Sequence, residues 1–298
     1  MATLREVKSR IGGVKKTQKV TKAMKMVAAA KLRRAQGNVV AARPYARSMG
    51  SLLRQLAPNL DEAATPLLAP REVRSVALVV VTSDRGLCGA FNANVIRATV
   101  SRIEKKYPRA LEEQRLRLFC VGKKGFDYFS KRHYNVSGKY VGVYANLVFP
   151  QAQTITREIV EGYLKQEFDK VEVIYNEFTS VARQRIVTDP FLPVQPNTPE
   201  GGLAGEEPMR VDYIYEPSSV EIVNALVPRH LNIQIWKVLL ESNAAEQGAR
   251  MAAMENATEN ANEMISYLQL VYNKARQASI TKELLEVVGG AEALKRTG

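Results

Sequence analysis

The chain has 298 residues, of which 46% are hydrophobic and 24% are charged, a composition typical of a soluble protein with a sizeable core. The longest strongly apolar run, Val76 to Val81, is far shorter than the roughly 20 residues that a membrane-spanning helix needs. The N-terminus lacks the apolar stretch of a signal peptide, and Cys88 and Cys120 fit no metal-binding spacing. These features argue against a membrane, secreted or zinc-binding protein and favour two reduced cysteines in a cytosolic compartment.

The net charge of +13 is concentrated at the start of the chain. Residues 1–57 contain 14 Lys and Arg side chains against Glu6 alone, whereas the remaining 29 basic and 29 acidic side chains balance. Such a bias indicates a negatively charged partner, either an acidic protein surface or the phosphates of a nucleic acid. Nucleic acid is the weaker alternative, because the charges surround the first helix and no aromatic residue that could stack on bases precedes Tyr45.

The first predicted helix occupies residues 1–58. Thr3 and Glu6 have the spacing of a capping box, so the helix is expected to begin there. Pro44 is expected to bend the helix and Pro58 to end it. Apolar residues recur at helical spacing along one face: Leu4, Val7, Ile11, Val14, Ala28, Leu32, Ala35, Val39 and Ala42.

Two features interrupt this apolar face. The pattern weakens at Gln18 and Thr21, where polar residues occupy the expected positions. Gly12 and Gly13 each cost about 1 kcal/mol relative to Ala inside a helix. This cost predicts a neighbour that packs too closely there for a side chain.

Residues 71–190 alternate between strand and helix patterns. This alternation predicts a Rossmann-like three-layer α/β domain with a mostly parallel sheet. The last two strands are close enough to form a hairpin, which predicts an antiparallel edge. The predicted strands cover residues 73–82, 115–121, 135–144, 171–178 and 181–188, and the predicted helices cover residues 90–106, 123–132 and 151–168.

A turn from Ser83 to Gly89 follows the first predicted strand, at the position where α/β folds bind phosphates. It contains neither the GxGxxG nor the GxxxxGK[ST] pattern. Three interpretations stay open: a tight structural turn, the nucleotide site of an α/β enzyme with helical arms, or a contact loop for another protein. No catalytic arrangement is recognisable, because His133 and His230 belong to no triad or zinc motif.

The chain is predicted to end in a second long helix. Residues 191–217, rich in Pro, Gly and Glu, are expected to form a linker loop, and the helix is expected to occupy residues 218–298. Pro228 should kink this helix near its start, and Gly289-Gly290 offers a C-terminal cap.

The last helix carries a coiled-coil seam with small side chains, in steps of four and three with one five-residue step. Because Ala side chains bury little apolar area, the helix needs a long partner, and the first helix supplies it. The predicted seam is Leu231, Ile235, Val238, Ser242, Ala245, Ala249 and Ala252, followed after the five-residue step by Ala257, Ala261, Met264, Leu268, Val271, Ala275, Ala278, Lys282 and Leu285.

Three stretches closely resemble the γ subunit of F-type ATP synthases. They are TQKVTKAMKMVAAAK at 17–31, SDRGLCG at 83–89 and YNKARQASITKEL at 272–284. The resemblance covers essentially the whole chain in the same order. It implies a non-catalytic subunit without a cofactor, whose terminal helices pair antiparallel as a shaft inside a ring of α and β subunits. The α/β domain would then meet the ε subunit and the ring of c subunits, and rotation of the shaft would couple ion flow to ATP synthesis or hydrolysis on β.

The resemblance also implies which residues contact other subunits. Met24 and Lys25 match positions near the acidic lever segment of β. Arg276, Gln277 and Thr281 match positions that hydrogen-bond a loop of β. All five are therefore expected to be contacts between rotor and stator.

Asp84 and Arg85 lie in the family's turn, and the sequence does not identify their partner. The chain has no close cysteine pair like the inserted dithiol of plant chloroplast members, so thiol regulation is not expected. No mitochondrial presequence is evident either. These departures favour a bacterial enzyme, with this subunit at the cytoplasmic face of the inner membrane. A basic coiled-coil protein that holds nucleic acid is the alternative from a different class.

Overall fold

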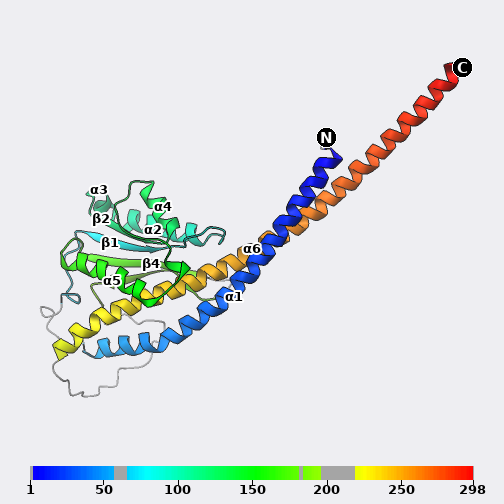
Figure 1. Cartoon of the computed structure of the whole chain (residues 1–298). Helices are drawn as coiled ribbons and strands as arrows, with labels where there is room; N and C mark the ends of the chain where they lie inside the picture. The colour runs from blue at the N-terminus through cyan, green and yellow to red at the C-terminus, as the bar shows by residue number, and fades with distance from the viewer. Residues whose placement is uncertain (1–2, 57–65, 181–183, 196–218, 298) are drawn as a thin grey trace. The chain divides into compact units, whose positions relative to one another are not determined.

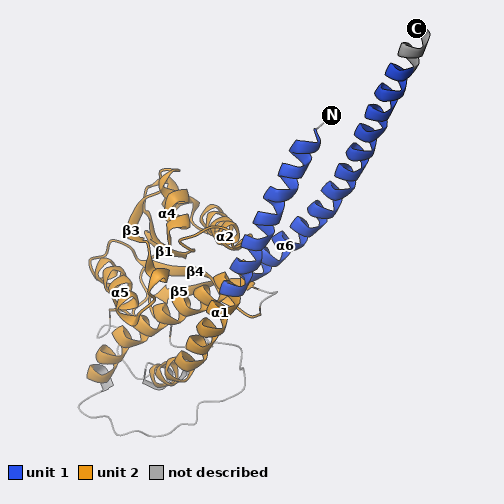
Figure 2. Ribbon diagram, turned by 45° about the vertical axis from the view of Figure 1, so that its right-hand side comes forward, with its two compact units in different colours: residues 1–27, 251–298 blue, residues 28–250 orange. Residues whose placement is uncertain are grey.

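A computed structural model describes residues 3–56, 66–180, 184–195 and 219–297 of the chain (Figure 1). The chain forms two compact units, one of residues 1–27 and 251–298 and the other of residues 28–250 (Figure 2). Two long helices contribute to both units, α1 (Leu4–Leu56) and α6 (Ser219–Thr297). Within the described ranges, no helix combines the length and the apolar character needed to cross a membrane.

The unit of residues 28–250 is built on a five-stranded sheet with the strand order β3-β2-β1-β4-β5. Strand β1 pairs in parallel with β2 and β4, β2 pairs in parallel with β3, and β4 pairs antiparallel with β5. The predicted mostly parallel sheet with an antiparallel edge is therefore confirmed. The strands are β1 (Val76–Val81), β2 (Leu116–Val121), β3 (Val136–Tyr140), β4 (Lys170–Phe178) and β5 (Gln184–Leu192).

Helices cover both faces of this sheet and complete the three predicted layers (Figure 1). On one face, residues of α2 (Phe91–Lys106), α3 (Pro108–Glu112) and α4 (Lys123–Ser130) share a core with β1 and β2. On the other face, α5 (Phe149–Leu164) and the first part of α6 share a core with β1 and β4. All six residues of β1 are buried, as expected for a central strand covered on both faces.

Helix α6 joins the α/β domain through a strip of β-branched and leucine side chains. Val223, Val227, Leu231 and Ile235 follow one another at four-residue steps, and each is at most 1% exposed. Beside them, the Trp236 ring meets the Phe149 ring of α5 edge to face, with centroids 5.9 Å apart. The packing therefore makes the beginning of α6 part of the domain core.

Several predicted boundaries differ from the structure. The predicted strand 135–144 ends at Tyr140, because Gly142 takes a left-handed conformation, with φ of 84°, and turns the chain into a short 3-10 helix, η3 (Val143–Ala145). Neither η3 nor α3 was predicted. Strand β5 extends to Leu192, two residues beyond the predicted edge of the domain. Residues 196–217 of the predicted linker loop lie outside the described residues.

Both helices run through the prolines that were expected to bend or kink them, and Pro58, expected to end α1, lies outside the described residues. Helix α1 continues through Pro44 to Leu56, and α6 continues through Pro228. The predicted cap at Gly289-Gly290 is wrong, since α6 runs on to Thr297. Neither of these two glycines has the positive φ that a C-terminal cap requires.

The predicted start of α1 is confirmed. The backbone N–H of Glu6 donates to Thr3 Oγ1 over 3.3 Å, and the N–H of Thr3 donates to Glu6 Oε2 over 2.9 Å. The expected close neighbour at Gly12 and Gly13 is absent from the described part of the chain, because a Cβ built on either residue would meet no heavy atom within 4 Å.

Candidate interaction surfaces on the paired helices and the turn after β1

Helix α1 buries one continuous seam in steps of three and four. In the unit of residues 1–27 and 251–298, the seam positions Leu4, Val7, Ile11, Val14, Gln18, Thr21 and Lys25 are buried or half-buried, and Met24 beside them is half-buried. In the other unit the same spacing continues through Ala28, Leu32, Ala35, Val39, Ala42, Ala46, Met49 and Leu53. The apparent weak stretch at Gln18 and Thr21 is therefore part of the seam, occupied by polar side chains.

Helix α6 supplies the matching seam in the same unit. The predicted seam is buried or half-buried at Ala252, Ala257, Ala261, Leu268, Val271 and Ala275, but it is wrong at Met264, which is 49% exposed. Ala278, Lys282 and Leu285 are exposed as well. Buried or half-buried residues recur in steps of three and four at Met251, Met254, Thr258, Ala261, Ile265, Leu268, Tyr272, Ala275 and Ser279. Ala252, Ala253, Glu255, Ala257 and Val271 beside them are half-buried as well.

Three polar pairs join the two helices across this seam. The side-chain amide of Gln18 donates to Asn262 Oδ1. The Thr21 and Thr258 hydroxyls lie 2.8 Å apart. The ammonium group of Lys25 pairs with the carboxylate of Glu255. Residue numbers rise on α1 while they fall on α6, so the two helices are antiparallel, as predicted.

The outside of α1 in this unit is strongly basic. Its exposed cations are Arg5, Lys8, Arg10, Lys15, Lys16, Lys19 and Lys22. These side chains are spread around the outside of the helix, away from the seam. An acidic partner could therefore meet basic side chains from several directions.

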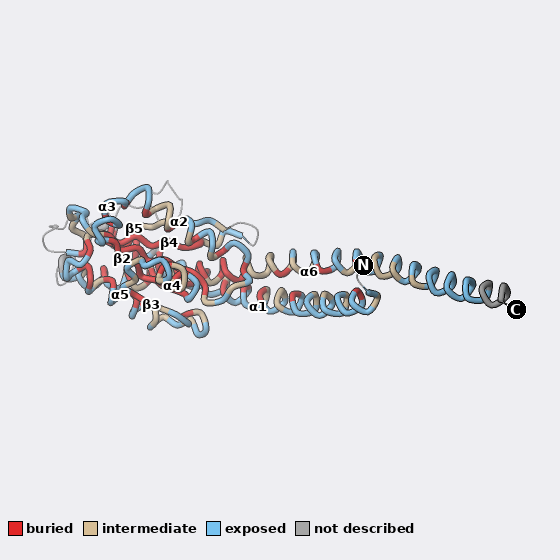
Figure 3. Tube along the Cα trace, turned by 90° about the horizontal axis from the view of Figure 1, so that it is seen from above, coloured by how far each residue is buried: buried red, intermediate tan, exposed pale blue. Residues whose placement is uncertain are grey.

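The far end of α6 is exposed on every side. Residues 280–291 are all exposed, as the colouring of this stretch in Figure 3 shows. They include a set of large apolar side chains that water does not favour, which indicates a partner surface. The apolar residues are Ile280, Leu284, Leu285, Val287 and Val288.

The five predicted rotor contacts fall into two environments. Arg276, Gln277 and Thr281 are exposed on α6, and the Thr281 hydroxyl donates to the backbone carbonyl of Gln277 over 2.9 Å. Met24 and Lys25 are half-buried, and Lys25 already pairs with Glu255 of this chain. Their contacts with another subunit stay a prediction.

In the turn after β1, Asp84 holds two other segments of the domain. Its Oδ1 atom accepts hydrogen bonds from the backbone N–H groups of Lys123 and Gly142, each over 3.0 Å. These bonds tie the start of α4 and the loop after β3 to the turn. Arg85 and Leu87 are exposed, so they are the side chains of the turn that remain available to a partner.

The turn is also fixed to α2 and α6. Ser83 N–H donates to Asn92 Oδ1 over 2.8 Å, and Arg250 Nη1 donates to the carbonyl of Gly86 over 2.6 Å. Arg250 also pairs with Glu246 over 2.6 Å. Burial raises the pKa of Glu246, although the hydrogen bond from Arg250 opposes that rise.

The position where related α/β folds bind phosphate is filled by this chain's own groups. The first three backbone N–H groups of α4 donate to Asp84 Oδ1, the Ser83 carbonyl and Thr82 Oγ1. A Cβ at Gly122, where φ is 90°, would lie 2.1 Å from the Thr82 carbonyl oxygen. This packing supports a structural turn over a nucleotide site. No cluster of three or more metal-binding side chains occurs among the described residues.

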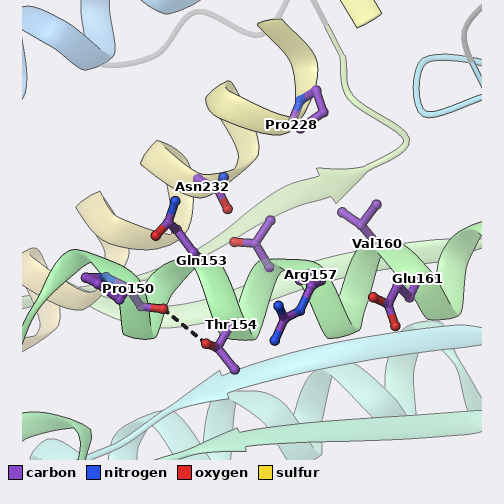
Figure 4. A pocket seen from close by; sticks show the side chains of 9 residues that line it. Pro150, Gln153, Thr154, Arg157, Val160, Glu161, Pro228 and Asn232 are labelled. Carbon is purple, nitrogen blue, oxygen red and sulfur yellow. Dashed lines mark hydrogen bonds between the residues drawn. The ribbon is translucent and has the colours of Figure 1, made fainter. Parts of the chain in front are cut away.

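Two open grooves run beside α6 within the α/β domain unit, with volumes of about 480 and 550 Å³. Gln153 of α5 and Asn232 of α6 line both of them. In Figure 4, Arg157 and Glu161 of α5 and Pro228 of α6 border the first groove. The second lies beside Tyr45, Phe149 and Trp236. Neither lining contains a histidine or cysteine that could act as a nucleophile or a general base near neutral pH.

Comparison with known proteins identifies relatives along the whole chain. A family model described as ATP synthase matches residues 3–294. The ATP synthase gamma chain of Chloroherpeton thalassium is 50% identical and is covered in full, as is this chain. The ATP synthase gamma chain of Chlorobaculum parvum is 51% identical over 99% of this chain and all of the relative.

Solved structures are similar in fold. A chain in the central stalk and c-ring of the Tetrahymena thermophila mitochondrial ATP synthase is 26% identical, with a TM-score of 0.60 over 80% of this chain and 99% of that chain. A chain of the Euglena gracilis mitochondrial ATP synthase has a TM-score of 0.66 over 98% of this chain and 94% of that chain. At 19% identity, the Euglena chain shows the fold alone.

Proposed function

The chain belongs to the ATP synthase gamma-chain family, and we propose that it is the central rotor shaft of an F-type ATP synthase. In this role it couples ion-driven rotation of a c-ring to ATP synthesis or hydrolysis at the catalytic β subunits, and it regulates ATPase activity and proton flow. The observation that carries the proposal is the match at about 50% identity over the full length, both long helices included. The likeness to a chain of a solved central stalk supports it.

The geometry suits a part that turns inside a ring and performs no chemistry itself. Two antiparallel helices with small seam residues such as Ala261 and Ala275 make a slender rod. The exposed cations of α1 attract acidic surfaces of the α and β subunits at every angle of rotation. The ATP chemistry then belongs to the surrounding ring, and the shaft contributes only its asymmetric surface.

The contacts with β are assigned to the two groups of residues that match the family's contact positions. Arg276, Gln277 and Thr281 would hydrogen-bond a loop of β, and their exposure on α6 supports this role. Met24 and Lys25 would lie near the acidic lever segment of β. Lys25 keeps a side-chain exposure of 37% despite its pair with Glu255, so its ammonium group can still interact with a second carboxylate.

The subunit would be peripheral, on the cytoplasmic face of a bacterial inner membrane. Its similarity to gamma chains of the bacteria Chloroherpeton and Chlorobaculum supports this placement. The α/β domain would meet the ε subunit and the c-ring. Arg85 and Leu87 are exposed in the turn after β1 and offer one surface for such a contact.

Reconstitution with the α and β subunits of the same organism tests the proposal. A single thiol introduced by Lys131→Cys, at an exposed position next to α4, carries a bead, while the native Cys88 and Cys120 are buried and should not react. With the ring fixed to a surface, ATP should drive stepwise rotation of the bead in one direction. The same complex without ATP is the control. A ring that hydrolyses ATP equally well with and without this chain, with no rotation, would refute the proposal.

A further inference from the structure

The seam between α1 and α6 in the unit of residues 1–27 and 251–298 repeats its spacing, so the spacing alone does not fix the alignment of the helices. Its steps of three and four repeat every seven residues on both helices. Sliding one helix by seven residues therefore places seam positions opposite seam positions again. Ala261 and Ala275 lose little by such a slide, because small side chains have little shape to match, whereas Ile265, Leu268 and Tyr272 are larger.

The polar pairs do distinguish the alignments. We propose that Gln18–Asn262, Thr21–Thr258 and Lys25–Glu255, which together form a polar ladder, lock the axial register of α1 against α6. This inference goes beyond the proposed function and does not depend on any partner subunit. In this proposal the polar pairs select one axial alignment of the two helices among those that the repeated spacing allows.

The buried middle of the ladder supplies most of the discrimination. Thr21 is 8% exposed, and its hydroxyl lies 2.8 Å from that of Thr258. Each hydroxyl also lies within hydrogen-bond distance of a carbonyl of its own helix, 3.0 Å from Gln18 for Thr21 and 2.7 Å from Met254 for Thr258. A slide of seven residues would place Thr21 opposite Ile265 or Met251 and leave both threonines without each other. Each hydroxyl would keep the carbonyl of its own helix but would face an apolar side chain in place of the other hydroxyl, and the loss of this cross-helix contact disfavours the slid alignments.

The two outer pairs also favour the observed alignment over the slid ones. Lys25 and Glu255 have opposite charges, and their side chains are 37% and 45% exposed. Solvent screening makes such a pair a weak source of stability, but a mismatched alignment loses it altogether. Gln18 and Asn262 form the third pair: Gln18 lies three residues before Thr21, and the exposed Asn262 lies four residues after Thr258. Polar residues in a coiled-coil seam commonly lower stability and raise specificity of register, and the ladder has that composition.

A cross-linking experiment on the full chain tests the lock. The ladder's register, continued by one layer, places Val14 opposite Ile265, whereas a slide of seven residues places Val14 opposite Tyr272. Disulfide formation should therefore be at least about tenfold faster in the Val14→Cys, Ile265→Cys chain than in the Val14→Cys, Tyr272→Cys chain.

Replacing the ladder with apolar side chains should remove this preference without unfolding the helices. In a background with Thr21→Val, Thr258→Val, Gln18→Ala and Asn262→Ala, which keeps only the weak Lys25–Glu255 pair, the tenfold preference should fall to about threefold or less while the Tm holds or rises. A preference that stays at about tenfold in this background would overturn the proposal.

A charge swap provides a second, independent readout if the apolar variant fails to fold. Lys25→Glu and Glu255→Lys should each lower the Tm and the cross-linking preference, and the double swap should recover at least half of both losses. Lys22→Glu, an exposed change outside the seam, is the matched control and should leave the preference unchanged. Losses in the double swap that equal the sum of the single losses would count against the ladder.

Discussion

Glu172 shows how a single buried carboxylate organises one end of the sheet. It is 2% exposed, and Arg102 donates two hydrogen bonds to it, each over 2.9 Å. The Tyr107 hydroxyl donates a third over 2.7 Å, and Lys106 a fourth over 3.1 Å. Burial alone would raise the pKa of Glu172, but the hydrogen bonds from Arg102, Tyr107 and Lys106 outweigh burial and lower the pKa to about 2.

Glu172→Gln should destabilise the chain by about 1–3 kcal/mol at pH 7, less than for a fully buried pair because the cations are partly exposed. The folded-state pKa lies below the unfolded value, so the wild-type stabilisation is complete above about pH 5 and disappears as the pH falls to about 2. Urea unfolding should therefore show that the difference in the free energy of unfolding between variant and wild type is smaller at pH 3 than at pH 7. Glu113→Gln, which removes an exposed pair with Arg115, should change stability by no more than about 0.5 kcal/mol. A difference in the free energy of unfolding that does not change with pH would contradict this account.

Asp84 and Arg85 separate structural from partner roles within one turn. Asp84→Ala removes the acceptor of two backbone N–H groups and should cost about 1–2 kcal/mol in the isolated chain. Arg85→Ala, at an exposed position, should change the free energy of unfolding by no more than about 0.5 kcal/mol. Chemical denaturation measures both. Equal stability of the two variants would show that the Asp84 bonds do not hold the turn.

The sequence placed Asp84 correctly in a turn but could not reveal what it binds. Its two partners, Lys123 and Gly142, lie 39 and 58 residues further along the chain, so only the folded sheet brings them together. Local patterns carry information about elements, whereas this contact depends on how β1, β2 and β3 are ordered.

At the scale of elements, the long helices were predictable in type and orientation but less so in rotation. Helix α6 contains so many alanines that neighbouring faces look alike, and the predicted seam included the exposed Met264, whereas the structure half-buries its neighbour Ile265. The polar pair Thr21–Thr258 escaped prediction for a related reason, because polar residues were treated as interruptions of an apolar pattern. Matching polar positions on both helices was the signal that could have found it.

Gly12 and Gly13 now carry a prediction opposite to the one from sequence. An added Cβ meets nothing within 4 Å at either position, so Gly12→Ala with Gly13→Ala should raise stability by up to about 1 kcal/mol per residue through helix propensity. Thermal unfolding of the full chain measures this gain. If a stator loop packs against the pair, the stabilised variant will assemble poorly with the α and β subunits. A loss of stability in the isolated chain would instead restore the close neighbour inferred from sequence.

At the scale of the whole molecule, long sequence motifs indicated the protein family. Charge and helix patterns alone left more than one function open. The excess of 14 basic over one acidic side chain in residues 1–57 is compatible with an acidic protein partner or with nucleic acid. Only the order of three motifs along the chain pointed to one family, which the full-length relatives then established. Charge reports the sign of a partner, but it does not report the partner's shape.

Replacing Arg276 and Gln277 together by Ala should lower ATP turnover of the assembled complex by about threefold or more if they bind β as proposed, since an Arg at an interface often carries much of its binding energy. The isolated chain should keep its stability, because both side chains are exposed. Lys274→Ala, at an exposed position two residues earlier, is the matched control. Turnover and assembly indistinguishable from wild type would remove both residues from the contact with β.

The pairing of the two ends of the chain also has a consequence for synthesis. Gln18 and Asn262 are 244 residues apart, so a ribosome working at about 5–20 residues per second produces α1 roughly 12–50 s before its partner. During that interval the seam of α1 faces water. The alanines of this seam limit the apolar surface available for aggregation, and the many positive charges of α1 repel neighbouring nascent chains. The composition that makes a slender rod therefore also protects the unfinished polypeptide.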